Sequence, residues 1–144
     1  MPIVASKILY QYAALPFSIT AEGEIRVLLV TTRGRREWII PKGWPIRNLT
    51  AAATAAREAY EEAGLVGTVV GDDPIGCYRY EKQKTVFEVS VFLFAVERQL
   101  RKWPERSERD TRWFAPDKAS KLVSCAGLAD VLLTVTHQVL VGHG

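Results

Sequence analysis

The stretch GWPIRNLTAAATAAREAYEEAGL, residues 43–65, indicates both the fold and the chemistry of this chain. Alanines fill the segment before its acidic end, and alanine has the highest helix propensity, so the stretch predicts a helix. Thr50 or Asn48 can cap the start of that helix. Gly64 stands where a residue in the left-handed conformation would end it.

Three carboxylates share one face of this predicted helix. Glu58 lies three positions before Glu61 and four before Glu62, and these spacings place all three side chains on one side. Like charges so placed repel each other, and their position near the negative end of the helix dipole adds to the cost. A hard divalent cation would offset that cost. Mg²⁺ binds carboxylate oxygens and keeps water molecules that phosphates can replace.

The spacing of these residues resembles the signature of the Nudix hydrolases, written G-x5-E-x7-R-E-U-x-E-E-x-G-U with U apolar. Gly43 occupies the first position, and the segment from Arg57 to Leu65 fits the second half without a gap. One position differs, because Leu49 stands where the family has its first glutamate. The resemblance implies an α/β fold of the Nudix type, an α/β/α sandwich with a mixed β-sheet. It also implies a Mg²⁺-dependent hydrolase of a phosphoanhydride that links a nucleoside diphosphate to another moiety.

The resemblance also implies a role for each residue of the motif. Glu61 and Glu62 are expected to bind the metal directly, and Glu58 to be the catalytic base or a shared ligand. Arg57 would orient a glutamate through a charge-assisted hydrogen bond. The backbone of Gly43 is expected to approach the metal, because a residue without Cβ permits close contact. Mn²⁺ accepts the same oxygen ligands as Mg²⁺. A solvated acidic helix face is the simpler alternative.

Nudix enzymes often take a further acid from outside the signature. Glu105 and Glu108 lie in the charged segment before residues 111–114, where the resemblance would place such an acid. Glu105 is our choice for the additional metal ligand. A charge at the rim of a loop is the alternative reading of either residue.

Two groups of basic residues suggest a substrate rich in phosphate. Arginine favours bidentate phosphate contacts, whereas lysine acts as a point charge. If both groups face the predicted helix, they form a cradle for a polyanion; otherwise they are ordinary surface charges. The substrate-binding candidates are Arg33, Arg35, Arg36, Lys42, Lys82 and Lys84. The run from Trp38 to Gly43 is similar to the Nudix branch that acts on diphosphoinositol polyphosphates and diadenosine polyphosphates.

Two other functions remain open at this point. Leu49 motivates the first, a non-catalytic Nudix-fold module that binds a nucleotide or a phosphorylated metabolite. The net charge of +3 and the pI near 9.0 suggest the second, an RNA 5′-pyrophosphohydrolase acting on capped or triphosphorylated RNA. Such a mild positive charge does not by itself argue for nucleic acid.

Length and composition indicate one soluble domain. A chain of 144 residues that is 48% hydrophobic suits a single domain, residues 1–144, with a sizeable core. No apolar run is long enough to span a membrane, and no signal peptide is evident. Cys77 and Cys125 form no metal or redox spacing, which favours a reduced cytoplasmic protein. Nothing in the sequence indicates the oligomeric state.

The remaining segments predict a sheet and further helices. An extended segment interrupted at Pro16 and the next strand should form one hairpin, and residues 75–81 and 85–96 a second. The predicted strands cover residues 7–19, 25–32, 38–40, 66–70, 75–81, 85–96 and 111–114. A short helix is expected near residues 118–122, and one continuous helix over residues 126–140.

Overall fold

The computed structural model describes residues 7–143 of the chain. The strands are β1 (Ile8–Ile19), β2 (Ile25–Thr31), β3 (Trp38–Ile39), β4 (Lys42–Gly43), β5 (Leu65–Val69), β6 (Gly76–Lys82), β7 (Thr85–Gln99) and β8 (Thr111–Phe114). The helices are α1 (Ala51–Ala63), α2 (Pro116–Leu122), α3 (Ala126–Leu133) and α4 (Val135–His143).

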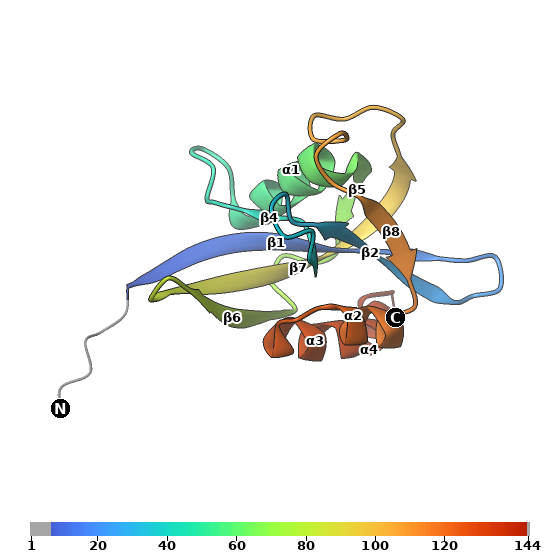
Figure 1. Ribbon diagram of the computed structural model, residues 1–144. Coiled ribbons are helices and arrows are strands. Elements are labelled where there is room, and N and C mark those ends of the chain that lie inside the picture. Colours follow the sequence, from blue (N-terminus) through green and yellow to red (C-terminus); the bar gives the residue numbers. More distant parts are fainter. Residues whose placement is uncertain (1–6, 144) are drawn as a thin grey trace.

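All strands join one mixed sheet. Its main path runs β3-β2-β1-β7-β5, while β4 pairs with β1, β6 with β7, and β8 with β2. The central strands β1 and β7 run parallel, and every other pairing is antiparallel. α1 covers one face of the sheet and α2, α3 and α4 cover the other (Figure 1). This layering confirms the expected α/β/α sandwich.

Each face of the sheet has its own core. Beneath α1, the buried alanines Ala55, Ala59 and Ala63 pack with Leu28 and Phe92 of the sheet. Because alanine has a short side chain, these contacts let α1 lie close to the strands. The helices on the other face supply larger apolar side chains, among them Leu128, Val131, Leu132, Val135 and Val139. The fixed position of α1 determines where its acidic end meets the sheet.

Both predicted signals at the ends of α1 are confirmed. Thr50 is the N-cap, and its hydroxyl accepts a hydrogen bond from the amide of Ala53 at 3.1 Å. Gly64 ends the helix with φ of 68° in the left-handed region, and its N–H donates to carbonyls of the last turn. A side chain at Gly64 would also collide with the ring of Trp103.

The predicted interruption at Pro16 is wrong, because β1 continues through this residue to Ile19. Ala14, two residues earlier, donates its N–H to the carbonyl of Pro41, on the edge of β1 that faces away from β7. Alternate residues of a strand point their N–H groups to the same edge, so Pro16 would also face that way. Pairing with β2 starts only at Phe17. The missing N–H of Pro16 therefore costs no ladder hydrogen bond.

The single C-terminal helix that the sequence predicts is instead two helices. α3 ends at Leu133 and α4 begins at Val135, with Thr134 between them. The hydroxyl of Thr134 donates to the carbonyl of Val131 at 2.7 Å and thus takes an acceptor of the helical ladder. Hydroxyls that bond back to the preceding turn bend or interrupt helices in this way.

The remaining strand predictions hold, with one addition. β1 and β2 form the first predicted hairpin, and β6 and β7 the second. The addition is β4, which pairs Gly43 with Tyr12 of the central strand and so fixes the start of the signature segment against the sheet.

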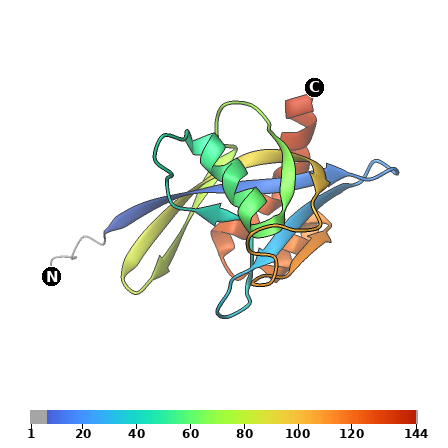
Figure 2. The ribbon, with the colours of Figure 1, turned by 90° about the horizontal axis from the view of Figure 1, so that it is seen from above.

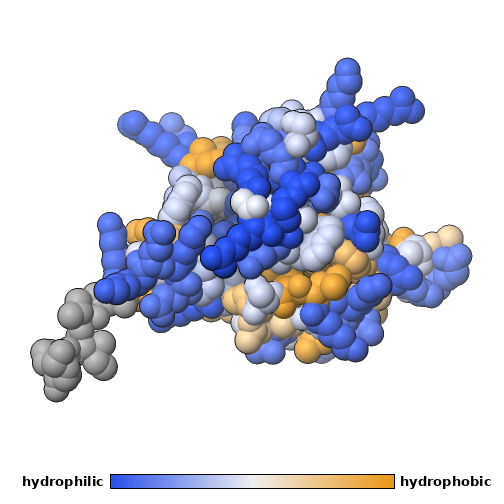
Figure 3. Space-filling view, viewed as in Figure 1, coloured by the Kyte–Doolittle hydropathy of each residue, from blue (hydrophilic) through white to orange (hydrophobic). Residues whose placement is uncertain are grey.

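Hydrophilic side chains cover most of the α1 side, and an apolar band lies lower, toward the C-terminal helices (Figure 3). Within residues 7–143, no helix is long and apolar enough to cross a membrane.

Candidate active site

Glu62 lies at the meeting point of α1, β4 and the segment between β7 and β8. Its side chain is almost completely buried, with the residue 2% exposed. One carboxylate oxygen, Oε2, accepts a hydrogen bond from the backbone N–H of Lys42 at 3.3 Å. The other oxygen, Oε1, is buried and has no hydrogen-bond partner among the described residues. A buried carboxylate oxygen without a donor is costly, and a bound cation would relieve that cost.

Arg109 links Glu62 to Glu105. Its Nη1 lies 3.8 Å from Oε1 of Glu62, and its Nε donates to Oε1 of Glu105 at 2.8 Å. The guanidinium also donates to the carbonyl of Thr31 at the end of β2, at 3.0 Å. Glu105 is therefore held beside α1, where its backbone N–H donates to the carbonyl of Glu61. The sequence analysis missed Arg109, although its i,i+4 spacing from Glu105 was a usable signal.

Gly43 and Glu58 are in close contact. A Cβ atom at Gly43 would collide with the carboxylate of Glu58, so glycine is required there for close approach. Glu61 is more exposed and lies 3.9 Å from Arg57, a loose i,i+4 ion pair. The three glutamates of the helix therefore differ, with Glu62 buried, Glu58 half-buried against β4, and Glu61 at the rim.

The site makes its carboxylates reluctant to ionise. Burial, followed by the charges of Glu61 and Glu105, raises the pKa of Glu58 from 4.5 to about 7. Burial also raises the pKa of Glu62 to about 8, against the opposing charge of Arg109. The charges of Arg109 and Lys42 oppose the shift of Glu58, and its pKa stays raised.

The donor set fits a divalent metal ion. In the described part of the chain, no three His, Cys, Asp or Glu side chains converge tightly enough to form a metal site as they stand. However, Oε1 of Glu62 accepts no hydrogen bond from the described residues, and the charges of Glu61 and Glu105 add to the effect of burial on the pKa of Glu58. Carboxylate oxygens are the ligands of Mg²⁺ and Mn²⁺. Glu58, Glu61 and Glu62 are the side chains that would hold such an ion, with Glu105 beside them.

The predicted basic residues occupy two separate places. Arg33 pairs with Glu108 at 3.0 Å and Arg36 with Asp110 at 3.1 Å, so both attach the β2–β3 loop to the segment that carries Glu105. Arg35 is exposed. Lys82 and Lys84 are exposed at the turn between β6 and β7, a different hairpin from the loop that carries the arginines. The structure therefore does not gather all of the basic candidates into one cradle.

Lys42 joins the sheet rather than projecting into solvent. Its ammonium donates to the Gln11 side chain at 3.2 Å and to the hydroxyl of Tyr80 at 3.0 Å. Burial lowers the pKa of Lys42. The ring of Tyr80 stacks on Phe87, which contacts the half-exposed ring of Trp44. A cation and a row of aromatic rings therefore line the side of the site next to Gly43.

The segment that carries Glu105 contacts the helix that carries the signature glutamates. Seen from above, the segment between β7 and β8 passes the C-terminal end of α1 (Figure 2). The family model for the NUDIX domain matches residues 10–133. The chain belongs to the Nudix family. This match includes all three helix glutamates of the Nudix signature, Gly43 and Glu105.

Individual Nudix proteins are similar to this chain over most of its length. Nudix hydrolase 13, mitochondrial, of Arabidopsis thaliana is 29% identical over 73% of this chain and 56% of its own length. Diphosphoinositol polyphosphate phosphohydrolase 2 of Rattus norvegicus is 32% identical over 73% of this chain and 58% of its own length. The matched region is thus little more than half of these relatives.

Solved Nudix structures have the same fold. A binary complex of a C. elegans Ap4A hydrolase superposes with a TM-score of 0.78 and 20% identity, covering 92% of this chain and 98% of the other. At that level of identity, the superposition supports the fold.

The cytoplasmic location expected from the sequence stays a prediction, since the name of the Arabidopsis relative places that protein in mitochondria.

Proposed function

We propose that this Nudix chain is a divalent-metal-dependent hydrolase of a phosphoanhydride, with Mg²⁺ as the physiological ion. The substrate class that we propose is a small molecule rich in phosphate, either a diphosphoinositol polyphosphate or a diadenosine polyphosphate. Similarity to the rat phosphohydrolase and to the C. elegans Ap4A hydrolase supports this class. A single domain, residues 1–144, would carry the activity.

The observation that carries the proposal is the crowding of carboxylates around Glu62. Its buried Oε1 has no hydrogen-bond partner among the described residues, and Glu58 and Glu105 add negative charge nearby. A metal ion bound there would neutralise phosphate charge and lower the pKa of a bound water. The chain itself would position the reaction. Arg109 holds Glu105 beside the helix, Gly43 leaves room for the Glu58 carboxylate, and Glu58 would accept the proton of the attacking water.

The basic residues would bind the phosphates of the substrate. Lys42 is already fixed by Gln11 and Tyr80, so its charge is positioned in advance. The hydrogen bond to Glu108 raises the pKa of Arg33, and the charges of Glu105 and, more weakly, Glu62 add to this effect. We therefore expect Lys42 and Arg33 to act at the site itself. Arg35, Arg36, Lys82 and Lys84 would extend recognition to the more distant charges of a long polyanion.

The test is product release with and without Mg²⁺ from diadenosine polyphosphates, diphosphoinositol polyphosphate, nucleoside triphosphates, a nucleotide sugar and 5′-triphosphate RNA. Each substrate is also given to the Glu61→Gln, Glu62→Gln double variant. Metal-dependent turnover of one class that is lost in the variant would support the proposal. Turnover retained without both carboxylates would contradict it. Preference for the RNA, with an affinity that falls steeply with salt, would favour the pyrophosphohydrolase instead.

A second candidate is a binding module that does not turn its ligand over. The observation that favours it is Leu49, which replaces a signature glutamate and lies exposed in the loop before α1. A thermal shift with one ligand of the panel, without any metal-dependent product, would select this candidate.

A further inference from the structure

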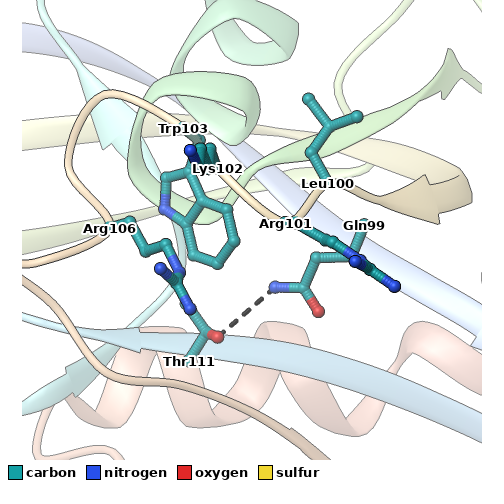
Figure 4. Close-up of a pocket in the computed structure, with 7 residues that line it drawn as sticks. All are labelled: Gln99, Leu100, Arg101, Lys102, Trp103, Arg106 and Thr111. Atoms are coloured by element: carbon teal, nitrogen blue, oxygen red, sulfur yellow. Dashed lines mark hydrogen bonds between the residues drawn. The ribbon is translucent and has the colours of Figure 1, made fainter.

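A groove lined by cations lies beside the C-terminal end of α1, separate from the carboxylates of the candidate active site. We call it the Trp103 groove. Its volume is about 470 Å³, within the range of small-molecule sites. Figure 4 shows its lining side chains, which include Arg101, Lys102, Arg106, Trp103, Gln99 and Thr111. No carboxylate side chain of residues 7–143 lines it, and a second hollow of about 540 Å³ shares Lys102, Trp103 and Arg106 with it.

The base of this groove is firmly attached to α1. The indole Nε1 of Trp103 donates to the carbonyl of Glu62 at 3.1 Å, and the side chain of Gln99 donates to the carbonyl of Ala63 at 2.9 Å. The N–H of Leu100 donates to the carbonyl of Gly64 at 2.8 Å. Carbonyls at a helix end need such donors, and here the groove residues supply them. These hydrogen bonds hold the groove residues against the end of α1.

The cations of the groove are available to a ligand. Within residues 7–143, Arg101, Lys102 and Arg106 form no ion pair with any carboxylate. By contrast, Arg33, Arg36 and Arg109 each pair with a carboxylate. Because hydrogen bonds already occupy the last carbonyls of α1, the groove cations are not needed to satisfy that helix end. Three unpaired cations around one hollow point to an anion.

The position of Trp103 indicates what kind of anion fits. The backbone of Gly64 packs against the indole, and the guanidinium of Arg106 lies over the ring at 5.8 Å from its centroid. With the ring so covered, the groove offers no open aromatic face for a nucleobase. The contact instead favours a position of the exposed Arg106 side chain beside the indole. The planar guanidinium of an arginine suits the paired oxygens of a phosphate.

We propose that the Trp103 groove is an oligophosphate-binding site, distinct from the active site. It would bind a short chain of phosphates through Arg101, Lys102 and Arg106, with Gln99 and Thr111 as neutral hydrogen-bonding groups. The phosphates are those of a free oligophosphate or of a nucleotide whose base remains in solvent. This inference does not depend on turnover at the glutamates.

The experiment is calorimetric titration of the full chain with tripolyphosphate in the presence of EDTA, which leaves the active site without metal. The Arg101→Gln, Lys102→Gln double variant should bind about tenfold more weakly, because it loses two charge-assisted contacts. The matched control is the Lys118→Gln, Lys121→Gln double variant, which removes the same charge from exposed positions of α2. It should retain the wild-type dissociation constant within about twofold.

A spectroscopic readout locates the bound phosphates. The chain has four tryptophans, and the Trp103→Phe variant assigns the indole N–H resonance of Trp103. That resonance should move on addition of tripolyphosphate. Equal affinity of the groove variant and wild type, or shifts confined to β4 and β6, would overturn the proposal.

Two further ligands define the source of the phosphates. If ATP binds as tripolyphosphate does, the groove recognises phosphates alone, as we propose, whereas much tighter binding of ATP would contradict a site that leaves the base in solvent. Tighter binding of hexaglutamate than of tripolyphosphate would overturn the proposal in favour of an acidic protein partner.

Discussion

Nη1 of Arg109 lies 3.8 Å from Oε1 of Glu62, and the same guanidinium donates to Glu105 at 2.8 Å. One buried cation therefore serves two carboxylates from different parts of the chain. The Arg109 side chain is 11% exposed, so solvent screens these contacts only weakly. This arrangement makes Arg109 a positioning residue for the metal site that we propose.

Replacing Arg109 should affect both stability and the site. Arg109→Gln leaves two carboxylates without their shared cation and should cost about 3 kcal/mol of unfolding free energy. Arg109→Lys keeps the charge but loses the fork that reaches both Glu105 and the Thr31 carbonyl, so its cost should be smaller. Urea denaturation in EDTA measures both. Arg112→Gln, at an exposed position of β8, is the control and should change stability by less than about 0.5 kcal/mol.

A positioning role also predicts a kinetic effect. Arg109→Lys should raise the Mg²⁺ concentration needed for half-maximal turnover, because Glu105 is no longer held in place. An unchanged metal requirement in a folded Arg109→Lys variant would contradict this role and leave Arg109 a purely structural residue.

The stability of the metal-free protein should fall as pH rises. The pKa values of Glu58 and Glu62 are raised from 4.5 to about 7 and about 8. Between pH 4.5 and 8 the folded state therefore binds more protons than the unfolded state, and stability decreases across that window. The measurement is the melting temperature in EDTA from pH 5 to pH 8.

Glu62→Gln supplies the control for this pH dependence. It removes the group with the higher pKa, so the decline between pH 5 and pH 8 should become shallower. The variant should also be at least as stable as wild type at pH 8, where wild type must bury a charge. A melting temperature that rises with pH in wild type would show that the metal-free fold does not raise the pKa values of these carboxylates.

Gly43→Ala should damage the site while preserving the fold. The three atoms nearest to the added Cβ all belong to the carboxylate of Glu58, which can move away. The change in unfolding free energy should therefore be below about 1 kcal/mol. Displacement of the Glu58 carboxylate should lower turnover by at least about tenfold.

Gly34→Ala is the matched control for Gly43→Ala, because its Cβ would meet nothing within 4 Å. It should leave both stability and turnover near wild type. Equal turnover of the two variants would mean that close approach of Gly43 to Glu58 has no role in the reaction.

Leu49→Glu restores the glutamate of the family signature. Leu49 is 38% exposed, so the substitution should change stability by less than about 0.5 kcal/mol. If this position helps to hold metal, the Mg²⁺ concentration for half-maximal rate should fall roughly threefold, as for one added partly exposed charge. Leu49→Gln is the control, because glutamine has nearly the size of glutamate but carries no charge. The same metal requirement in both variants would assign the position a structural role.

Local sequence signals predicted the helix, the hairpins and the order of elements. Thr50 and Gly64 act within a few residues of themselves, so their roles could be seen without coordinates. Pro16 was misread because its effect depends on which edge of β1 its missing N–H would face. Thr134 was misread because the helical spacing of its apolar neighbours continues across it, while its hydroxyl bonds to Val131.

The helix glutamates could be predicted from the sequence, whereas the residues that contact them were harder to predict. The spacing from Gly43 to Gly64 indicated the helix glutamates, but the partners of those glutamates come from distant segments. Arg109 reaches Glu62 only because β8 pairs with β2 and returns the chain to α1. The pairing of Arg33 with Glu108 depends on the same return. Such long-range contacts follow from topology and leave little trace in local spacing.

The parallel pairing of β1 with β7 joins two segments of the chain that are synthesised at different times. Ile8 pairs with Val86 and Phe17 with Ala95, so the centre of the sheet joins the first strand to one that is made much later. Contacts so far apart in sequence form slowly, because a long loop must close first. β8, which returns the chain toward the glutamates, is synthesised later still. During synthesis, the acidic helix is therefore complete while only the first four strands exist, and its glutamates are made well before Arg109.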